Sequence, residues 1–161
     1  MKINNIVDSF VKSINKNEND IEAYSGIEWI DKITNRLPTK FPPSFMSLIS
    51  RYIFDDFEAG KIWFYANRGD GSEEELGQSI FRDEIISRVT INNGFIHFAK
   101  SSDGSYDPIC FDIRKRKNNG EFHVVKLDHE VLLQFAKIKV KENICSSLLE
   151  YMELHLQKIT S

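Results

Sequence analysis

Apolar residues in the first third of the chain recur at the spacing of helices. Over residues 2–16 they return every three or four positions, which predicts an amphipathic helix. The polar stretch "NKNENDIEAYSG" then interrupts the pattern. Ser25 and Glu28 have the spacing of a capping box, so a second helix is expected to open there and to end before Leu37-Pro38. Its buried face should carry Ile27, Ile30 and Ile33, with Trp29 at the edge.

A third helix is expected to start at Pro42-Pro43, since proline suits a first helical turn. Its inward residues should be Phe45, Leu48, Ile49 and Tyr52. From Tyr52 the pattern changes to short aromatic and β-branched runs. "YIFDDF" and "KIWFYA" predict two strands around a turn at residues 58–60. The polar segment "NRGDGSEEELGQ" is expected to form a loop.

Residues 80–90 predict a helix that Asn93-Gly94 ends. Its inward residues should be Phe81, Ile85 and either Ile86 or Val89. Three strands, "FIHFAK", "PICFDI" and "EFHVVKL", follow with turn-rich connections, which favours an antiparallel meander. A closing helix of about four turns is expected from the apolar spacing; its stripe would be Cys145, Leu148, Leu149, Met152, Leu156 and Ile159.

Together these elements predict an α+β fold, in which a mainly antiparallel curved sheet has helices before, within and after it. Strand alternation places Ile109, Phe111 and Ile113 on one face, with Cys110 and Asp112 on the other. The side chains expected to be largely buried are Trp29, Phe45, Phe98 and Leu149.

Length and charge restrict the class of protein. With 161 residues the chain predicts a single domain, and a net charge of −3 predicts no general attraction to nucleic acid or to an anionic membrane. No apolar run approaches the ~18 residues of a membrane span, and the amino-terminal segment lacks the pattern of a signal peptide. The expected location is the cytoplasm, with Cys110 and Cys145 as buried reduced thiols.

The segment "FAKSSDGSYDPICFD" holds the strongest candidate chemistry. Asp103 and Asp107 lack the alternating acids and distal glutamate of a calcium loop. In an open turn both carboxylates would lie in water with ordinary pKa values. Asp103-Gly104 is instead typical of a hairpin turn, because both residues tolerate a positive φ. The interpretation favoured here is a turn.

Other chemistry-bearing residues give no motif. His97 and His123 are expected on neighbouring strands, but no HxH, HxxxH or HExxH spacing occurs, so neither a metal nor another cofactor is predicted. "RKRK" at 114–117 is expected to be a solvated hairpin tip. No GxSxG elbow occurs. This favours a binding protein over an enzyme; the enzymatic alternative is a small hydrolase using Asp103, Asp107 and His97.

The order of the elements resembles the SUKH superfamily, which includes a fungal regulator of cell-wall assembly and many bacterial immunity proteins. "IEWIDKITNRLPTKFPPSFMSLISRY" is similar to its opening helix, Leu-Pro pair and Phe- and Leu-rich helix. "NNGFIHFAKSSDGSYDPICFDI" and "EFHVVKLDHE" resemble its later strands. The family-like core spans residues 22–155 of a single domain 1–161, and residues 1–18 form an added helix. A departure is "RYIFDDFEAG", where the family often has Asn-Gly.

The resemblance implies an α+β fold and a non-catalytic immunity protein that binds and neutralises a cognate protein toxin, often a nuclease. The alternative binding function is a regulatory or scaffold module of the cell-wall-assembly type. Two docking surfaces are predicted. The first is acidic and consists of Asp55, Asp56, Glu58, Asp70, Glu73, Glu74 and Glu75; the second is the turn with Asp103, Tyr106 and Asp107. The competing interpretation of the acids is that they only keep the protein in solution.

Overall fold

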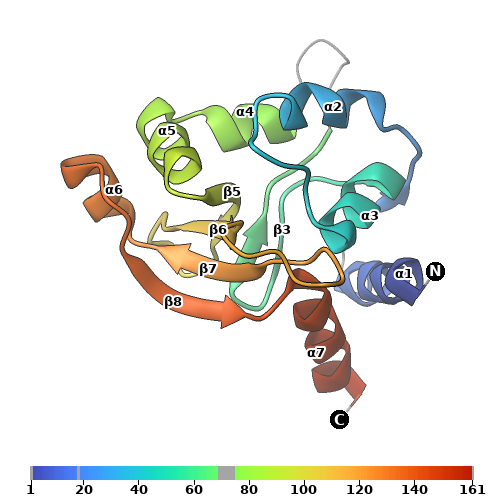
Figure 1. Cartoon of the computed structure of the whole chain (residues 1–161). Helices are drawn as coiled ribbons and strands as arrows, with labels where there is room; N and C mark the ends of the chain where they lie inside the picture. Colours follow the sequence, from blue (N-terminus) through green and yellow to red (C-terminus); the bar gives the residue numbers. More distant parts are fainter. Residues whose placement is uncertain (1, 18, 69–74, 161) are drawn as a thin grey trace.

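The computed structural model describes residues 2–17, 19–68 and 75–160, and this part of the chain has an α+β fold (Figure 1). The six strands of its large sheet form one antiparallel meander, in which neighbours in sequence are neighbours in space. They are β3 (Phe57–Ala59), β4 (Ile62–Phe64), β5 (Phe95–Ser101), β6 (Pro108–Asp112), β7 (His123–Leu127) and β8 (Val140–Cys145). The predicted fold class and the predicted meander over residues 95–127 are confirmed.

Seven helices and a second, two-stranded sheet complete the described part of the chain. The small sheet pairs β1 (Glu22–Ala23) with β2 (Tyr52–Ile53). The helices are α1 (Lys2–Asn15), α2 (Glu28–Thr34), α3 (Pro43–Arg51), α4 (Glu75–Phe81), α5 (Glu84–Asn92), α6 (His129–Phe135) and α7 (Leu148–Thr160). Figure 1 shows α5 and α6 on the opposite side of the sheet from α1, α3 and α7.

Both faces of the large sheet are buried at its centre. Ile109 and Phe111 of β6 contribute to the larger core, whereas Cys110 contributes to a smaller core with Leu132 of α6. The predicted alternation along this strand is therefore confirmed. The rings of Phe98 and Phe111 stack with 3.9 Å between their centroids, so the larger core is dominated by aromatic contacts.

The amino-terminal helix α1 is part of the larger core. Its buried apolar side chains are Val7, Phe10, Val11 and Ile14. Polar contacts fix it to α3: the Ser47 hydroxyl donates to Asn4 at 2.7 Å, and Asp8 accepts hydrogen bonds from Arg51 and Tyr52. Helix α1 and the family-like segment thus share one hydrophobic core.

A buried glutamate joins the starts of two helices to the sheet. Glu121, which has no exposed surface, precedes β7 and accepts hydrogen bonds from the Ser44 amide at 2.9 Å and the Ser44 hydroxyl at 2.6 Å. The Leu149 amide in the first turn of α7 also donates to this carboxylate, at 3.4 Å. An acidic group at a helix amino terminus satisfies orphan amides and stabilises the helix dipole.

The start of α2 differs from the prediction. The helix begins at Glu28, and no side chain caps it, so the expected capping box between Ser25 and Glu28 does not form. The preceding segment instead runs beside the end of α3, where the Tyr24 amide donates to the Arg51 carbonyl. This pairing leaves Ile27 61% exposed and Trp29 half-buried, whereas both were expected nearer the core.

The helix predicted over residues 80–90 is two helices. Asp83 caps α5 by accepting hydrogen bonds from the amides of Ile85 and Ile86, and this cap separates α5 from α4. Because α5 starts there, Val89 is buried and Ile85 is exposed, which contradicts the predicted inward position of Ile85. Helix α4 begins inside the segment expected to be a loop.

The structure differs from the prediction at one strand and its turn, and it contains two elements that were not predicted. β2 joins the small sheet, so the strand expected over 52–57 is divided, and the following turn lies at Gly60–Lys61. Helix α6 and strand β8 were not predicted, and β8 contains Cys145, which was expected in the closing helix. Both cysteines are free thiols; burial raises the pKa of Cys110 well above its usual value and that of Cys145 to about 12.

Which side of α7 faces the core can be tested by mutation. Leu148 is fully buried, whereas Leu149, expected to be largely buried, is only partly buried. Replacing Leu148 with alanine should lower the free energy of unfolding by about 2–5 kcal/mol. Leu149→Ala, the matched control, should cost clearly less because less apolar surface is lost. Chemical denaturation of both variants measures the difference, and equal losses would contradict the phase of the helix.

Candidate functional site

The turn between β5 and β6 separates its two acids. Asp103 lies at the surface, where it accepts a hydrogen bond from the Ser105 amide at 2.9 Å and pairs with Lys126 at 3.3 Å. Hydrogen bonds from Ser105 and Ser101 hold the pKa of Asp103 below its usual range. Gly104 has a φ of +82°, as the hairpin-turn prediction requires.

Asp107 turns inward and is fully buried. Its carboxylate accepts hydrogen bonds from the His129 amide at 3.1 Å, from His129 Nδ1 at 2.6 Å and from the Lys141 ammonium at 2.8 Å. Burial raises the pKa of Asp107, but the hydrogen bonds from Lys141 and His129 outweigh it and lower the pKa to about 2. The expectation that both acids lie in water with ordinary pKa values is wrong, because α6 and β8 supply these donors.

The same cluster has donor atoms spaced for a metal ion, since one ligand atom each of Asp107, Asp128 and His129 lies within 4.8 Å of the others. These atoms already have partners. Asp128 accepts hydrogen bonds from the amides of Glu130 and Val131 as the cap of α6, and Lys141 places an ammonium on Asp107. A cation would have to displace that ammonium. The cluster therefore connects α6 and β8 to the β5–β6 turn through hydrogen bonds.

An Asp–His pair is also part of a catalytic triad, but a triad needs a hydroxyl or thiol hydrogen-bonded to the histidine. No serine, threonine or cysteine of the described ranges hydrogen-bonds to His129. His97 contacts Tyr65 instead, with 2.8 Å between its Nε2 and the phenol oxygen. Asp103, Asp107 and His97, the residues of the hydrolase hypothesis, therefore contact different partners and do not hydrogen-bond to one another. His97 and His123 lie on β5 and β7 with β6 between them, which corrects the expectation of neighbouring strands.

Part of the predicted acidic surface is assembled by the fold. A buried amide, Asn67, accepts a hydrogen bond from the Phe54 amide and donates to the Tyr52 carbonyl, which fixes the chain beyond β2. Asp55 then pairs with Arg68 at 2.9 Å, and Asp56 accepts a hydrogen bond from the Ala66 amide.

Glu75 at the start of α4 lies near these acids: burial raises its pKa, and so do the charges of Asp56 and Asp55. Asp20 lines a small pocket of about 180 Å³ with Asp55 and Asp56. We call Asp20, Asp55, Asp56 and Glu75 the acidic surface. Glu58 is not part of it, because it points to the opposite face of β3 from Phe57, beside Trp63. Asp70, Glu73 and Glu74 lie outside the described residues.

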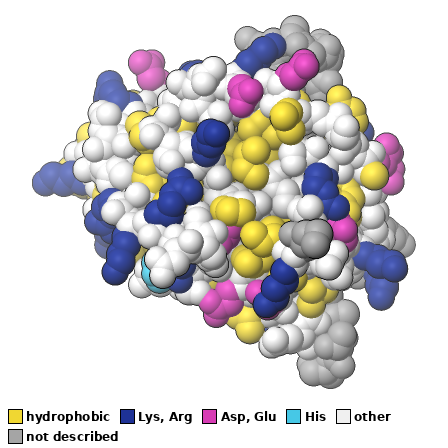
Figure 2. All heavy atoms as spheres, turned by 45° about the vertical axis from the view of Figure 1, so that its right-hand side comes forward, with side chains coloured by type: hydrophobic (Ala, Val, Ile, Leu, Met, Phe, Trp, Pro, Cys, Tyr) yellow, Lys and Arg dark blue, Asp and Glu magenta, His cyan; other side chains and the backbone are white. Residues whose placement is uncertain are grey.

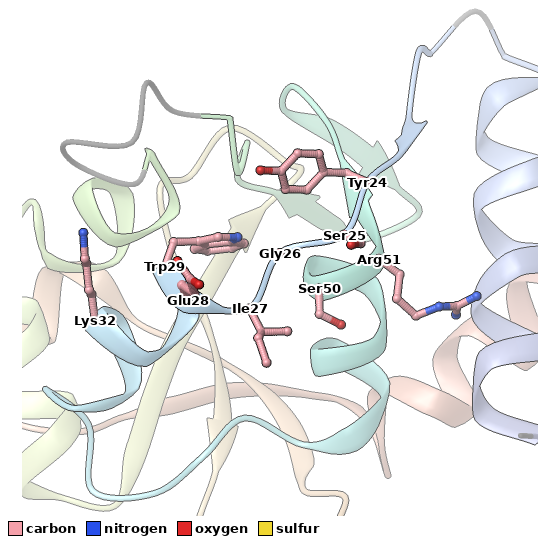
Figure 3. Close-up of a pocket in the computed structure, with 9 residues that line it drawn as sticks. All are labelled: Tyr24, Ser25, Gly26, Ile27, Glu28, Trp29, Lys32, Ser50 and Arg51. Atoms are coloured by element: carbon pink, nitrogen blue, oxygen red, sulfur yellow. The ribbon is translucent and has the colours of Figure 1, made fainter.

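A larger pocket, of about 740 Å³, was not predicted. It lies between the segment Tyr24–Trp29 and the last turn of α3, where Ser50 points into it (Figure 3). We call it the groove. Tyr24 is 50% exposed beside it. Gly26 makes this placement possible, since a Cβ there would lie 2.8 Å from the Tyr24 ring.

The groove combines apolar side chains with serine and charged side chains. Neither Glu28 nor Lys32 has an ion pair with another described residue. Arg51 extends away from the groove toward α1, where it pairs with Asp8 (Figure 3). On the face turned forward in Figure 2, exposed hydrophobic side chains gather with basic and acidic ones around them. Exposed aromatic groups with a polar rim are typical of protein-binding surfaces.

The basic run at 114–117 lies in the connection between β6 and β7, where Arg114, Lys115 and Arg116 are exposed, as expected for a solvated tip. Arg114 pairs with Asp112 at 2.8 Å and lies 4.8 Å from the centroid of the Phe95 ring. Arg116 donates to the Thr39 hydroxyl and lies 4.6 Å from the centroid of the Phe122 ring. These two exposed cations thus also lie over aromatic rings at the edge of the core.

A scan against models of known protein families finds no match, and a search of curated proteins finds no similar sequence. The likeness to SUKH proteins accordingly rests on the order of the quoted segments. Across the described ranges, none of the helices has the length and apolar character needed to cross a membrane.

The role of Asp107 can be tested by Asp107→Asn. The variant should lose about 1.5–3 kcal/mol of unfolding free energy, because an amide accepts weakly from Lys141 and His129 and the buried charge pair is lost. The matched control is Asp103→Asn, whose surface pair should be worth less than about 1 kcal/mol. Urea unfolding at pH 7 gives both values. If Asp103→Asn lost more unfolding free energy than Asp107→Asn, the assignment of Asp107 as the acid that holds α6 and β8 would be wrong.

The buried His97 predicts a stability change in mild acid. Burial lowers its pKa to about 4, so the unfolded chain takes up a proton near pH 6.5 that the folded chain does not. Stability should be complete above pH 6.5 and fall as the pH drops toward 4. His97→Gln should reduce the difference in unfolding free energy between pH 7 and pH 5. Part of this pH-dependent difference should persist in the variant, because burial also lowers the pKa of His155. An unchanged difference would contradict the assignment to His97.

Proposed function

We propose that this protein is a non-catalytic binding protein of the bacterial immunity type, which neutralises a cognate protein toxin by covering it. The observation that carries the proposal is the groove, in which Tyr24 and Ile27 are exposed and Trp29 is half-buried in a chain whose other large aromatic residues mostly form the core. Tyrosine and tryptophan at a concave surface are the residues that most often anchor a protein partner.

The groove and the acidic surface lie at the two ends of the small sheet. Tyr24 follows β1 into the groove, whereas Asp20 precedes β1 at the acidic end. On the paired strand the order is reversed: Arg51 precedes β2 and Asp55 follows it. A single partner could therefore contact both ends of this sheet with one continuous surface.

The two parts would contribute differently to binding. The carboxylates of the acidic surface crowd one another, and only Asp55 has a cation partner, Arg68, among the described residues. A basic partner, such as the substrate cleft of a nuclease, would relieve this repulsion and be steered toward the surface. The apolar side chains of the groove, Tyr24, Ile27 and Trp29, would supply the desolvated contacts that slow dissociation.

The resemblance to SUKH proteins supports the immunity assignment over a general adaptor role. The alternative, a regulatory or scaffold module, would use the same surfaces. The two differ in their genetic setting, because an immunity protein is encoded beside its toxin. The partner to test first is therefore the product of the neighbouring gene, purified and mixed with this protein.

Charge reversal at the acidic surface tests the electrostatic part. Asp20→Lys combined with Glu75→Lys should slow association with that partner on the order of tenfold at low salt and little at high salt. The matched control, Glu130→Lys on the distant α6, should leave the association rate within about twofold. Biolayer interferometry at two salt concentrations measures these rates. An unchanged rate at low salt would exclude the acidic surface as the docking site.

Truncation of the groove tests the apolar part. Tyr24→Ala and Ile27→Ala should each raise the dissociation rate on the order of tenfold, since hot-spot truncations cost more than about 1 kcal/mol. Both side chains are exposed, so the fold should be retained. The control is Ile85→Ala, an exposed isoleucine on α5. Loss of affinity in the control alone would move the docking site away from the groove.

A further inference from the structure

One end of the sheet face opposite the larger core carries a row of polar and aromatic side chains. Glu58 of β3, Trp63 of β4 and Lys100 of β5 are direct cross-strand partners and therefore lie side by side on this face. Glu58 is exposed, and Trp63 and Lys100 are half-buried. Farther along the sheet, the same face is covered by α5 and α6.

Lys100 contacts aromatic rings in this row but has no carboxylate partner among the described residues. Its ammonium lies 4.9 Å from the centroid of the Trp63 ring and 5.8 Å from that of Tyr106. Within the described ranges no carboxylate forms an ion pair with it. Asp103, in the adjoining turn, pairs with Lys126. The two rings orient the Lys100 ammonium but leave it without an anion.

Tyr106 has a backbone conformation that is unfavourable for a tyrosine. Its φ is +65°, in the left-handed region that glycine and asparagine adopt more readily, and its side chain is 73% exposed. The fold therefore gains little from a tyrosine here. A strained, exposed aromatic residue in a turn points to a role in contact with another molecule.

A pocket of about 150 Å³ lies among Trp63, Lys100 and Tyr106, and Ser101, Ser102 and Gly104 complete its lining. The approach over Gly104 is open, since a Cβ there would meet no atom within 4 Å. The volume suits a single side chain. Inside the same row, the indole Nε1 of Trp63 is buried without a hydrogen-bond partner in the described structure.

We propose that this pocket binds one carboxylate side chain of a partner protein. The carboxylate would pair with the Lys100 ammonium, and the methylene groups of a glutamate would lie against the Trp63 and Tyr106 rings. A nucleic acid fits less well, because Lys100 is the one cation among the described residues that line the pocket, whereas a chain of phosphates is bound by several cations. This binding is independent of the function proposed above.

The two tryptophans allow a direct test by NMR. The nitrogen-15-labelled protein is titrated with acetyl-Ala-Glu-Ala-amide, with the glutamine analogue, and with a single-stranded oligothymidylate. The glutamate peptide should shift the Trp63 indole and the Ser102 and Gly104 amide signals saturably and leave the Trp29 indole signal in place. The glutamine peptide should bind about tenfold more weakly.

Three variants separate recognition from folding. Lys100→Gln should remove the preference for glutamate, whereas the exposed control Lys115→Gln should keep it. Tyr106→Asn should weaken binding while the thermal midpoint stays equal or rises, since asparagine tolerates the left-handed backbone. The proposal is overturned by equal shifts from both peptides, by the absence of a saturable shift, or by a response to the oligothymidylate alone.

Discussion

Two buried carboxylates hold this fold together, one on each side of the sheet. Glu121 receives donors from the starts of α3 and α7, which cover the larger core. Asp107 receives donors from α6, which contributes Leu132 to the smaller core, and from β8, the last strand of the large sheet. A buried carboxylate is costly unless its oxygens are satisfied. Each acid therefore requires its own set of elements to be in place, which fixes those elements relative to the sheet.

These two anchors also position the surfaces through which the protein is proposed to act. Glu121 fixes the start of α3, and the last turn of that helix forms one wall of the groove. Asp107 pulls the end of the β5–β6 turn inward, and the preceding residue, Tyr106, stays exposed. A rigid interior supporting exposed aromatic residues reduces the entropy lost on binding.

The titratable side chains of the Asp107 cluster, and His97 of the hydrolase hypothesis, have structural partners. Asp107, Asp128 and His129 satisfy one another or the first amides of α6, and His97 packs against Tyr65 with its pKa lowered by burial. Charged side chains without an ion pair that lie beside exposed or half-buried aromatic rings are found elsewhere, at the groove rim and at Lys100. This distribution supports a protein that recognises partners, since unpaired charges beside exposed aromatic residues provide both steering and contact area.

The sequence by itself determined the elements that local periodicity specifies. Helix α1, the alternation along β6 and the Asp103-Gly104 turn follow from the spacing of apolar residues and from backbone preference at single positions. Only the tertiary structure decided what depends on distant partners. His129 and Lys141 lie 22 and 34 positions from Asp107, and no local pattern marks that pairing. Likewise, Ile27 and Trp29 are apolar residues of the kind expected on a buried helix face. They line a groove because the Tyr24–Gly26 backbone is hydrogen-bonded to the end of α3, which sets where α2 begins.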